Sequence, residues 1–280
     1  MQAILHCGPF RLGLDRPLVM GIVNATPDSF SDGGRHFGAA AAIAHGRQLV
    51  GEGADLLDIG GESSRPGAQP VSTEEELRRV LPVIEGLGEL GVPISIDTTK
   101  PEVMRRAAAA GAVLVNDIAA LRTPEALEAA AESGAAVCLM HMRGEPGTMQ
   151  AEPFYLDVVG EVHAFLAARV AAARAAGIAP ERIVVDPGFG FGKRIEHNLA
   201  LLQNLGRFAG LGQCILAGVS RKSMLGQITG RPVGERLAGG LAAALVAVRN
   251  GARILRVHDV AATRDALAVW AAATGQGETG

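Results

Sequence analysis

The sequence has little of several residue types, and each shortage argues against a class of protein. Its three cysteines (Cys7, Cys138, Cys214) lie far apart without CxxC spacing, which argues against a disulfide framework and indicates reduced thiols. The formal net charge of −3 argues against nucleic acid or an anionic membrane as the main partner. No apolar run reaches about 18 residues, and the start has no basic segment followed by a long apolar one. We therefore expect a soluble, cytoplasmic protein.

Aromatic residues are also scarce, at 4% of the chain, whereas hydrophobic residues make up 48%. The core must therefore consist mainly of Ala, Val, Leu and Ile. A chain of 280 residues could form one large α/β domain or two smaller domains. Because no stretch has the composition of an interdomain linker, we expect one domain over residues 1–280, with a disordered tail from about residue 274.

Short apolar runs alternate with Ala-rich segments along the chain, and this alternation predicts eight βα units. Before them, residues 3–14 contain two short runs around Gly8-Pro9, which predict a β-hairpin that covers one end of the main fold. The main strands are expected at 18–24, 55–60, 94–97, 113–116, 136–140, 183–186, 213–218 and 252–257. Helices are expected at 39–52, 72–90, 101–110, 124–132, 155–176, 196–205, after 223, and at 234–250 and 261–273.

The spacing of these strands favours a particular closure. Strand ends recur about every 33 residues, which matches the size of a (β/α)8 TIM barrel. An open doubly wound sheet is the alternative, because alternation of strands and helices does not by itself prove closure. We prefer the barrel, since polar residues at the end of every strand suit one central mouth.

The first of these strands leads into residues 20–34, MGIVNATPDSFSDGG, where an apolar run changes abruptly into polar and small residues. Each of the other strands also ends at polar or functional residues. A single such residue is often a helix cap or a surface charge, but the coincidence at every strand predicts an active site at one barrel mouth. The strand-end positions are Asn24, the 58–65 region, Asp97, Asn116, Met140-His141, Asp186, Gly218 with Lys222, and Arg256 with His258.

The residue types indicate two kinds of ligand. Asp97, Asn116 and Asp186 are short hydrogen-bonding groups next to the apolar Met140 and Phe191, which suits a flat, nitrogen-rich heterocycle. The rim carries donors and positive charge, which suits a phosphate or pyrophosphate together with Mg²⁺ held by oxygens such as that of Asn24. The rim residues are Arg65, Arg256, His258 and the Asn24 loop.

Eight motifs in order together resemble the dihydropteroate synthase family of the folate pathway: MGIVNATPDSFSDGG, DIGGESSRPGA, SIDT, NDI, LMHM, DPGFGFGK, GVSRKS and RVHD. They extend from Met20 to Asp259. The resemblance implies a pterin-binding barrel that condenses hydroxymethyl-dihydropterin pyrophosphate with p-aminobenzoate, giving dihydropteroate and pyrophosphate. It also implies a homodimer, Mg²⁺ as cofactor, and inhibition by sulfonamides. The helical segments 241–248 and 267–272 could supply the dimer interface or pack on the barrel.

The resemblance further implies a role for individual positions. The pterin ring would be held by Asp97, Asn116, Asp186 and Lys222, in a slot lined by Met140, Phe191 and Gly218. Pyrophosphate would be bound by Asn24, Arg256 and His258, with Asn24 also meeting Mg²⁺. The p-aminobenzoate pocket would comprise Phe30, Ser64, Arg65, Pro66, Lys222 and Ser223. Catalysis would rest on Asp97, Lys222, Arg256 and His258. Ser64 departs from the family, where Thr is frequent, and this difference removes one methyl group from the pocket.

Two alternatives use the same barrel. A methyltetrahydrofolate-dependent methyltransferase would need the ring-binding Asp and Asn residues, but not the TPDSFSDGG and ESSRPG loops or the RVHD ending, all of which are present. A non-catalytic pterin-binding paralogue would be expected to have lost one of Asn24, Arg65, Lys222 or His258, and all four are present. The sequence therefore favours the synthase.

Overall fold

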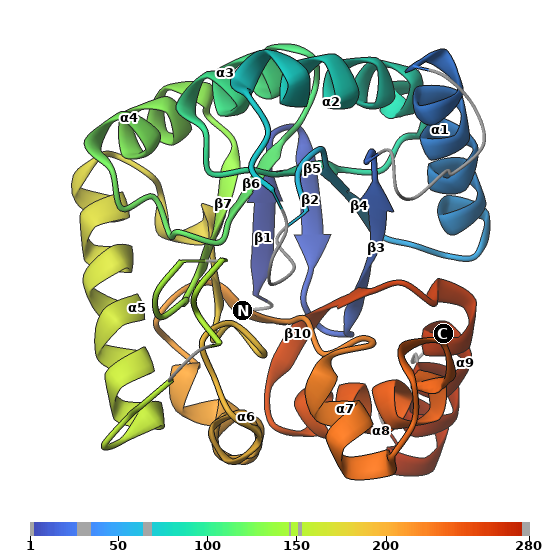
Figure 1. The fold of residues 1–280 in the computed structure, drawn as a ribbon, viewed down its shortest axis with the longest axis vertical. Coiled ribbons are helices and arrows are strands. Elements are labelled where there is room, and N and C mark those ends of the chain that lie inside the picture. Colours follow the sequence, from blue (N-terminus) through green and yellow to red (C-terminus); the bar gives the residue numbers. More distant parts are fainter. Residues whose placement is uncertain (1–2, 27–34, 64–68, 146, 151–152, 276–280) are drawn as a thin grey trace.

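The computed structural model describes residues 3–26, 35–63, 69–145, 147–150 and 153–275, and within them eight parallel strands close into a barrel surrounded by helices (Figure 1). The (β/α)8 prediction is confirmed, and the open-sheet alternative is excluded because the last strand, β10, pairs both with β9 and with β3, the first strand of the barrel. In barrel order the strands are β10 (Ala252–Val257), β3 (Leu18–Asn24), β4 (Leu56–Gly60), β5 (Ile94–Asp97), β6 (Leu114–Asp117), β7 (Ala136–Met140), β8 (Ile183–Asp186) and β9 (Cys214–Ala217).

The two faces of each strand serve different parts of the core. Alternate side chains such as Val19 and Val115 face the helices and join the large cluster between strands and helices. The intervening side chains, including Leu56, Leu114 and Val184, form a separate apolar cluster inside the barrel. Two positions further along these inward rows the residues become polar. Because every second side chain of a strand faces inward, the apolar residues inside the barrel are followed directly by polar residues at its mouth.

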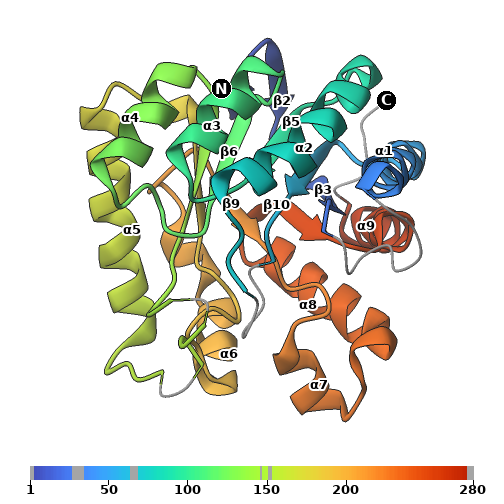
Figure 2. The same ribbon diagram turned by 45° about the horizontal axis from the view of Figure 1, so that its top comes forward.

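An antiparallel hairpin, β1 (Ile4–Cys7) and β2 (Phe10–Gly13), closes the opposite end of the barrel, as predicted. Leu5 and Cys7 of this hairpin are fully buried and, with Leu14, join the apolar cluster inside the barrel. Figure 2 shows the hairpin and α7 at opposite ends of the molecule. Only the mouth formed by the carboxyl ends of the strands is therefore left for chemistry.

Small residues allow the helices to pack closely on the strands, as the scarcity of aromatic residues requires. Ser72 and Thr123 cap α2 and α4 by accepting hydrogen bonds from Glu75 N and Ala126 N, each at 3.2 Å. The helices are α1 (Arg35–Gly51), α2 (Thr73–Leu87), α3 (Pro101–Ala109), α4 (Pro124–Ser133), α5 (Val158–Ala175), α6 (Ile195–Gln203), α7 (Ser223–Thr229), α8 (Leu237–Arg249) and α9 (Val260–Thr274).

Several boundaries differ from the sequence prediction for local reasons. Helix α5 begins at Val158 rather than at residue 155, because Asp157 accepts from Gly160 N at 3.0 Å and caps it there. Tyr155 instead donates to the carbonyl of Gly192 at 2.9 Å. Strand β4 begins one residue later than expected, since the carboxylate of Asp55 accepts from Val19 N at 2.7 Å.

Two further sequence expectations concern the thiols and the membrane. Cys7, Cys138 and Cys214 are free and buried, as predicted. No described helix is both long and apolar enough to cross a membrane. The tail predicted to be disordered from about residue 274 differs at its start, because Thr274 is the last residue of α9 and Gly275 caps that helix, while residues 276–280 lie outside the described residues.

Candidate active site

Arg256 is the centre of an ion-pair network at the polar mouth. Its Nε donates to Asp58 Oδ2 at 2.5 Å, and its Nη2 donates to Asp97 Oδ2 at 2.7 Å. Asn116 Nδ2 donates to the same Asp58 oxygen at 3.1 Å. Strands β4, β5, β6 and β10 thus each contribute one residue, and Arg256 is bound between two carboxylates.

Burial determines the charges in this network. Burial lowers the pKa of Arg256, but the negative charges of Asp58 and Asp97 more than offset it and raise that pKa. For Asp97 burial dominates and raises its pKa to about 7, with Arg256 opposing and Asp58 adding to the rise. The mouth therefore holds a permanent cation beside a carboxyl group that titrates near neutrality.

A second cation, Lys222, lies between β9 and α7. Its Nζ lies 4.1 Å from the centroid of the Phe191 ring, a cation–π contact. Burial and the nearby Arg256 lower the pKa of Lys222 to about 8, although Asp186 and Asp97 oppose this shift. Lys222 is therefore a cation at neutral pH but loses its proton at moderately alkaline pH.

An apolar wall lies beside these charges. Phe191 and Met140 belong to a small buried cluster that also contains Ile118, Met142 and Met149. Asp186, at the end of β8, is buried, and burial raises its pKa. Its Oδ1 accepts from Gly188 N at 2.7 Å, which fixes the carboxylate at the start of the next loop. Apolar and polar groups thus meet as the sequence predicts for a flat heterocycle.

The loop 187–193 is held by a buried lysine that the sequence prediction did not include. Lys193 is 3% exposed, and its Nζ donates to the carbonyls of Gly188 at 2.9 Å and Phe191 at 3.0 Å. The same Nζ lies 3.0 Å from His141 Nδ1. A Cβ at Gly188, where φ is +72°, would collide with the carbonyl oxygen of His141, so glycine is required there. GFGFGK is thus a tightly anchored pocket loop.

The remaining predicted residues surround the same mouth. Asn24 ends β3 and is partly buried, and Gly218 follows β9 directly. His258 follows β10, and its Nδ1 lies 3.0 Å from Ser220 Oγ. Ser223 is exposed as the first residue of α7. The predicted Phe30, Ser64, Arg65 and Pro66 lie outside the described residues.

Part of the loop after β4 is described, and it has a charged anchor. Lys100 forms ion pairs with Glu62 and with the buried Glu76, the latter at 2.5 Å. Arg79 Nη1 donates to the carbonyl of Gly61 at 2.9 Å. These contacts hold Gly61 and Glu62, which directly follow β4, in place before position 64.

Sequence reasoning named the region of Asp58 but did not include it as a site residue. A signal was present, since Asp58 is a charge within the apolar strand LLDIG, and a buried charge requires a partner. The partner could not be identified because Arg256 is 198 positions away. Among the described residues, no group of three or more His, Cys, Asp or Glu side chains could hold a metal ion.

Comparisons with known proteins agree with this geometry. Residues 20–258 match the family described as pterin binding enzyme. Dihydropteroate synthase of Neisseria meningitidis serogroup B is 53% identical over 96% of this chain and 97% of its own. A Xanthomonas albilineans dihydropteroate synthase structure with 4-aminobenzoic acid has a TM-score of 0.92 and 56% identity, covering 98% of this chain and 99% of its own. The Burkholderia cenocepacia enzyme complexed with 7,8-dihydropteroate has a TM-score of 0.89 and 55% identity, at 98% and 97% coverage.

Proposed function

The chain belongs to the pterin binding enzyme family, among its dihydropteroate synthases, and we propose that its barrel mouth joins hydroxymethyl-dihydropterin pyrophosphate to p-aminobenzoate. The products are dihydropteroate and pyrophosphate, so the enzyme is a transferase. One observation carries this assignment: the Arg256 network with Asp58, Asp97 and Asn116 lies at the same mouth as Lys222 and Asp186. Such a site offers acceptors to ring N–H groups and cations to a departing anion.

The pterin lies between the carboxylates and the apolar wall. Asp97, Asn116 and Asp186 hydrogen-bond the edge of the ring, while Met140 and Phe191 cover it. Because Met140 and Phe191 are at most 9% exposed, they present a preformed surface rather than one that must be ordered on binding. Gly218, without a side chain, leaves the floor of the slot open beside Arg256.

Pyrophosphate binds at the rim, to Asn24, Arg256 and His258. The donor set fits a Mg²⁺ ion that takes one protein oxygen, from Asn24, and its other ligands from phosphate and water. When bound, such an ion would neutralise charge on the leaving pyrophosphate. The guanidinium of Arg256, which the buried Asp58 holds in place, also stabilises the negative charge of the leaving pyrophosphate.

The amine substrate enters on the side of Lys222 and Ser223, with Phe30, Ser64, Arg65 and Pro66 completing its pocket. Lys222 faces both substrates in this arrangement. Its contact with Phe191 orients the ammonium group toward the slot. A sulfonamide, as an analogue of p-aminobenzoate, would compete for this pocket.

The reaction breaks the bond between the methylene carbon and the pyrophosphate oxygen, and the bonding electrons leave with pyrophosphate. The resulting methylene cation is conjugated with the electron-rich pterin and lies near the carboxylate of Asp97. The amine nitrogen of p-aminobenzoate then attacks the carbon and loses a proton to solvent. Ionisation before attack is the hypothesis, and a secondary isotope effect close to unity at the methylene would contradict it.

The direct test is pyrophosphate release by the purified protein with Mg²⁺ and the pterin pyrophosphate, with or without p-aminobenzoate. We expect release that depends on p-aminobenzoate and a yield of dihydropteroate equal to the pyrophosphate released. Lys222→Ala should reduce turnover strongly. Tight pterin binding without release would instead identify a non-catalytic paralogue. The proposal also includes a single domain, a cytoplasmic location and a homodimer. Sedimentation of the purified protein tests whether it is a homodimer.

A further inference from the structure

A strained turn presents Lys222 to the active site. The turn follows β9 and covers Val219–Lys222, and Lys222 N donates to the carbonyl of Val219 at 3.3 Å. Arg221 within it has φ of +56°, in the left-handed region that a non-glycine residue adopts only when its surroundings hold it there. The contacts that hold this turn therefore determine the position of Lys222.

Side chains after β10 fix one side of the turn. Arg221 forms a two-pronged ion pair with Asp259, with Nε to Oδ2 at 3.1 Å and Nη2 to Oδ1 at 2.5 Å. Ser220 Oγ accepts from His258 N at 3.3 Å and lies 3.0 Å from His258 Nδ1. Thr263 in turn donates its hydroxyl to the carbonyl of Asp259 at 2.7 Å. The residues that follow β9 are thus bonded to the residues that follow β10.

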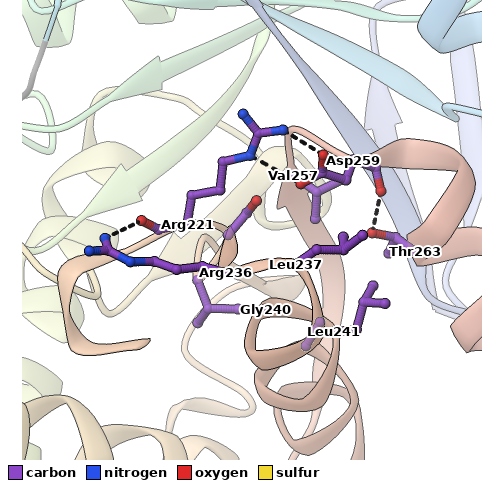
Figure 3. Close-up of a pocket in the computed structure, with 11 residues that line it drawn as sticks. Arg221, Arg236, Leu237, Gly240, Leu241, Val257, Asp259 and Thr263 are labelled. Atoms are coloured by element: carbon purple, nitrogen blue, oxygen red, sulfur yellow. Dashed lines mark hydrogen bonds and ion pairs between the residues drawn. The ribbon is translucent and has the colours of Figure 1, made fainter. Parts of the chain in front are cut away.

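Arg236, just before α8, holds the turn from the other side, as Figure 3 shows. Its Nη1 donates to the carbonyl of Arg221 at 3.1 Å and lies 3.4 Å from that of Lys222. Its Nε donates to the carbonyl of Arg231 at 3.0 Å. A Cβ at Gly226 would lie 2.6 Å from the guanidinium carbon, so this glycine provides the space that Arg236 occupies.

We propose that Arg236, with the Arg221–Asp259 ion pair, is a positioning residue for Lys222. In the part of the chain that the structure describes, the hydrogen bonds of its guanidinium all go to backbone carbonyls, so it acts on the reaction by fixing the backbone that carries Lys222. A planar guanidinium can reach several carbonyls at once, whereas the single ammonium of a lysine cannot. The proposal rests on the role of Lys222 in the proposed function.

A double-mutant cycle between Arg236 and Lys222 tests the proposal, because it measures whether one residue acts through the other. We expect Arg236→Ala to reduce kcat/KM by about 10- to 100-fold, the size of effect that a displaced catalytic group produces. In a Lys222→Ala background the same change should reduce the residual kcat/KM by less than about 3-fold, because the group it positions is absent. Arg236→Lys should give an intermediate loss, and it carries the cycle if Arg236→Ala does not fold.

Arg231→Ala is the matched control. Its side chain forms an exposed ion pair with Glu235 at 3.0 Å, and its backbone carbonyl, which Arg236 uses, remains. Its kcat/KM should stay within about 2-fold of wild type, as for most surface changes. Equal losses from Arg236→Ala with and without Lys222, or wild-type activity of Arg236→Ala, would overturn the proposal. An inactive wild-type protein would instead refute the proposed function, and an unaffected Lys222→Ala variant would remove Lys222 from the site and overturn the positioning role with it.

Discussion

Replacing Asp58 by asparagine is the sharpest probe of the Arg256 network. Asp58 is 0% exposed and accepts from both Arg256 and Asn116, while its other oxygen is buried without a partner in the described part of the chain. Asparagine has nearly the same shape but no charge. The substitution therefore removes one of the two carboxylates that hold Arg256 and leaves the packing of the barrel nearly unchanged.

The cost can be estimated from the contact that is lost. A hydrogen bond to a charged group contributes about 1.5–3 kcal/mol, and the charge of Asp58 is not screened by water, so we expect a loss of about 2 kcal/mol in unfolding free energy. For a chain of 280 residues, that corresponds to a Tm lower by about 3–4 °C. Because Asp97 is then the remaining carboxylate partner of Arg256 among the described residues, kcat/KM should also fall, by about 10-fold.

The pH profile gives a second, independent readout. The charge of Asp58 is one of the causes that raise the pKa of Asp97, and Arg256 lowers it. In Asp58→Asn the negative charge of Asp58 is gone, and the positive charge of Arg256 acts on Asp97 without competition from Asp58. Both changes lower the pKa of Asp97. If ionised Asp97 is required, the acid limb of kcat/KM should move to lower pH in Asp58→Asn.

Asp55→Asn is the control, because Asp55 lies three residues before Asp58, directly before β4 begins. Asp55 accepts from Val19 N at 2.7 Å and pairs with Arg16 at 2.7 Å, on the amino-terminal side of β4, whereas the mouth lies at the carboxyl ends of the strands. It should lower Tm without moving the acid limb. Thermal unfolding and pyrophosphate release between pH 5 and 9 measure both quantities. An acid limb in Asp58→Asn that stays in place or moves to higher pH would refute the reasoning.

Other predictions follow from the two lysines and from Asp97. The pH profile of wild-type kcat/KM should be bell-shaped, rising through the Asp97 pKa of about 7 and falling above the Lys222 pKa of about 8. Asp97→Asn should remove the acid limb and Lys222→Met the alkaline limb, and limbs that persist in both variants would exclude these assignments. Lys193→Met should lower the unfolding free energy by about 2–4 kcal/mol, because buried carbonyls lose their donor. Burial lowers the pKa of Lys193 to about 7, so the folded state binds fewer protons than the unfolded state above that pH. The unfolding free energy of the wild type therefore increases as pH rises above about 7, whereas that of Lys193→Met lacks this increase. The difference in unfolding free energy between the two proteins, measured by urea unfolding, should grow over that range.

The strands could be predicted from the sequence because a parallel barrel buries both faces of each strand. Runs such as Ile183–Asp186 and Ala136–Met140 are apolar to or almost to their ends, and their predicted bounds agree with the structure. Helix starts were harder to predict, since they depend on which side chain caps the first turn. Asp157 supplies that cap for α5, whereas the apolar pattern begins earlier at Tyr155. Local competition of this kind is not visible in periodicity.

The candidate site was predicted where a residue stands at a strand end, and missed where its importance depends on a distant partner. Asp97, Asn116 and Asp186 have a recognisable place in the pattern, and the structure brings them to one mouth. Asp58 and Lys193 gain their roles from Arg256 and from the carbonyls of loop 187–193, contacts that only the closed barrel creates.

The buried charges at the mouth show why this arrangement suits chemistry rather than stability. A barrel filled with apolar side chains to the ends of its strands would avoid the cost of burying Asp58 and of partly burying Asp97 and Arg256. Because the inward rows instead change from Leu56 to Asp58 and from Ile254 to Arg256 within two residues, the cation is fixed before any substrate arrives. A preorganised cation stabilises a departing anion without reorganising at the moment of reaction. In the proposed reaction, the same contact that stabilises Arg256 in the folded protein also places its charge beside the leaving pyrophosphate, so a substitution at Asp58 should change stability and activity together.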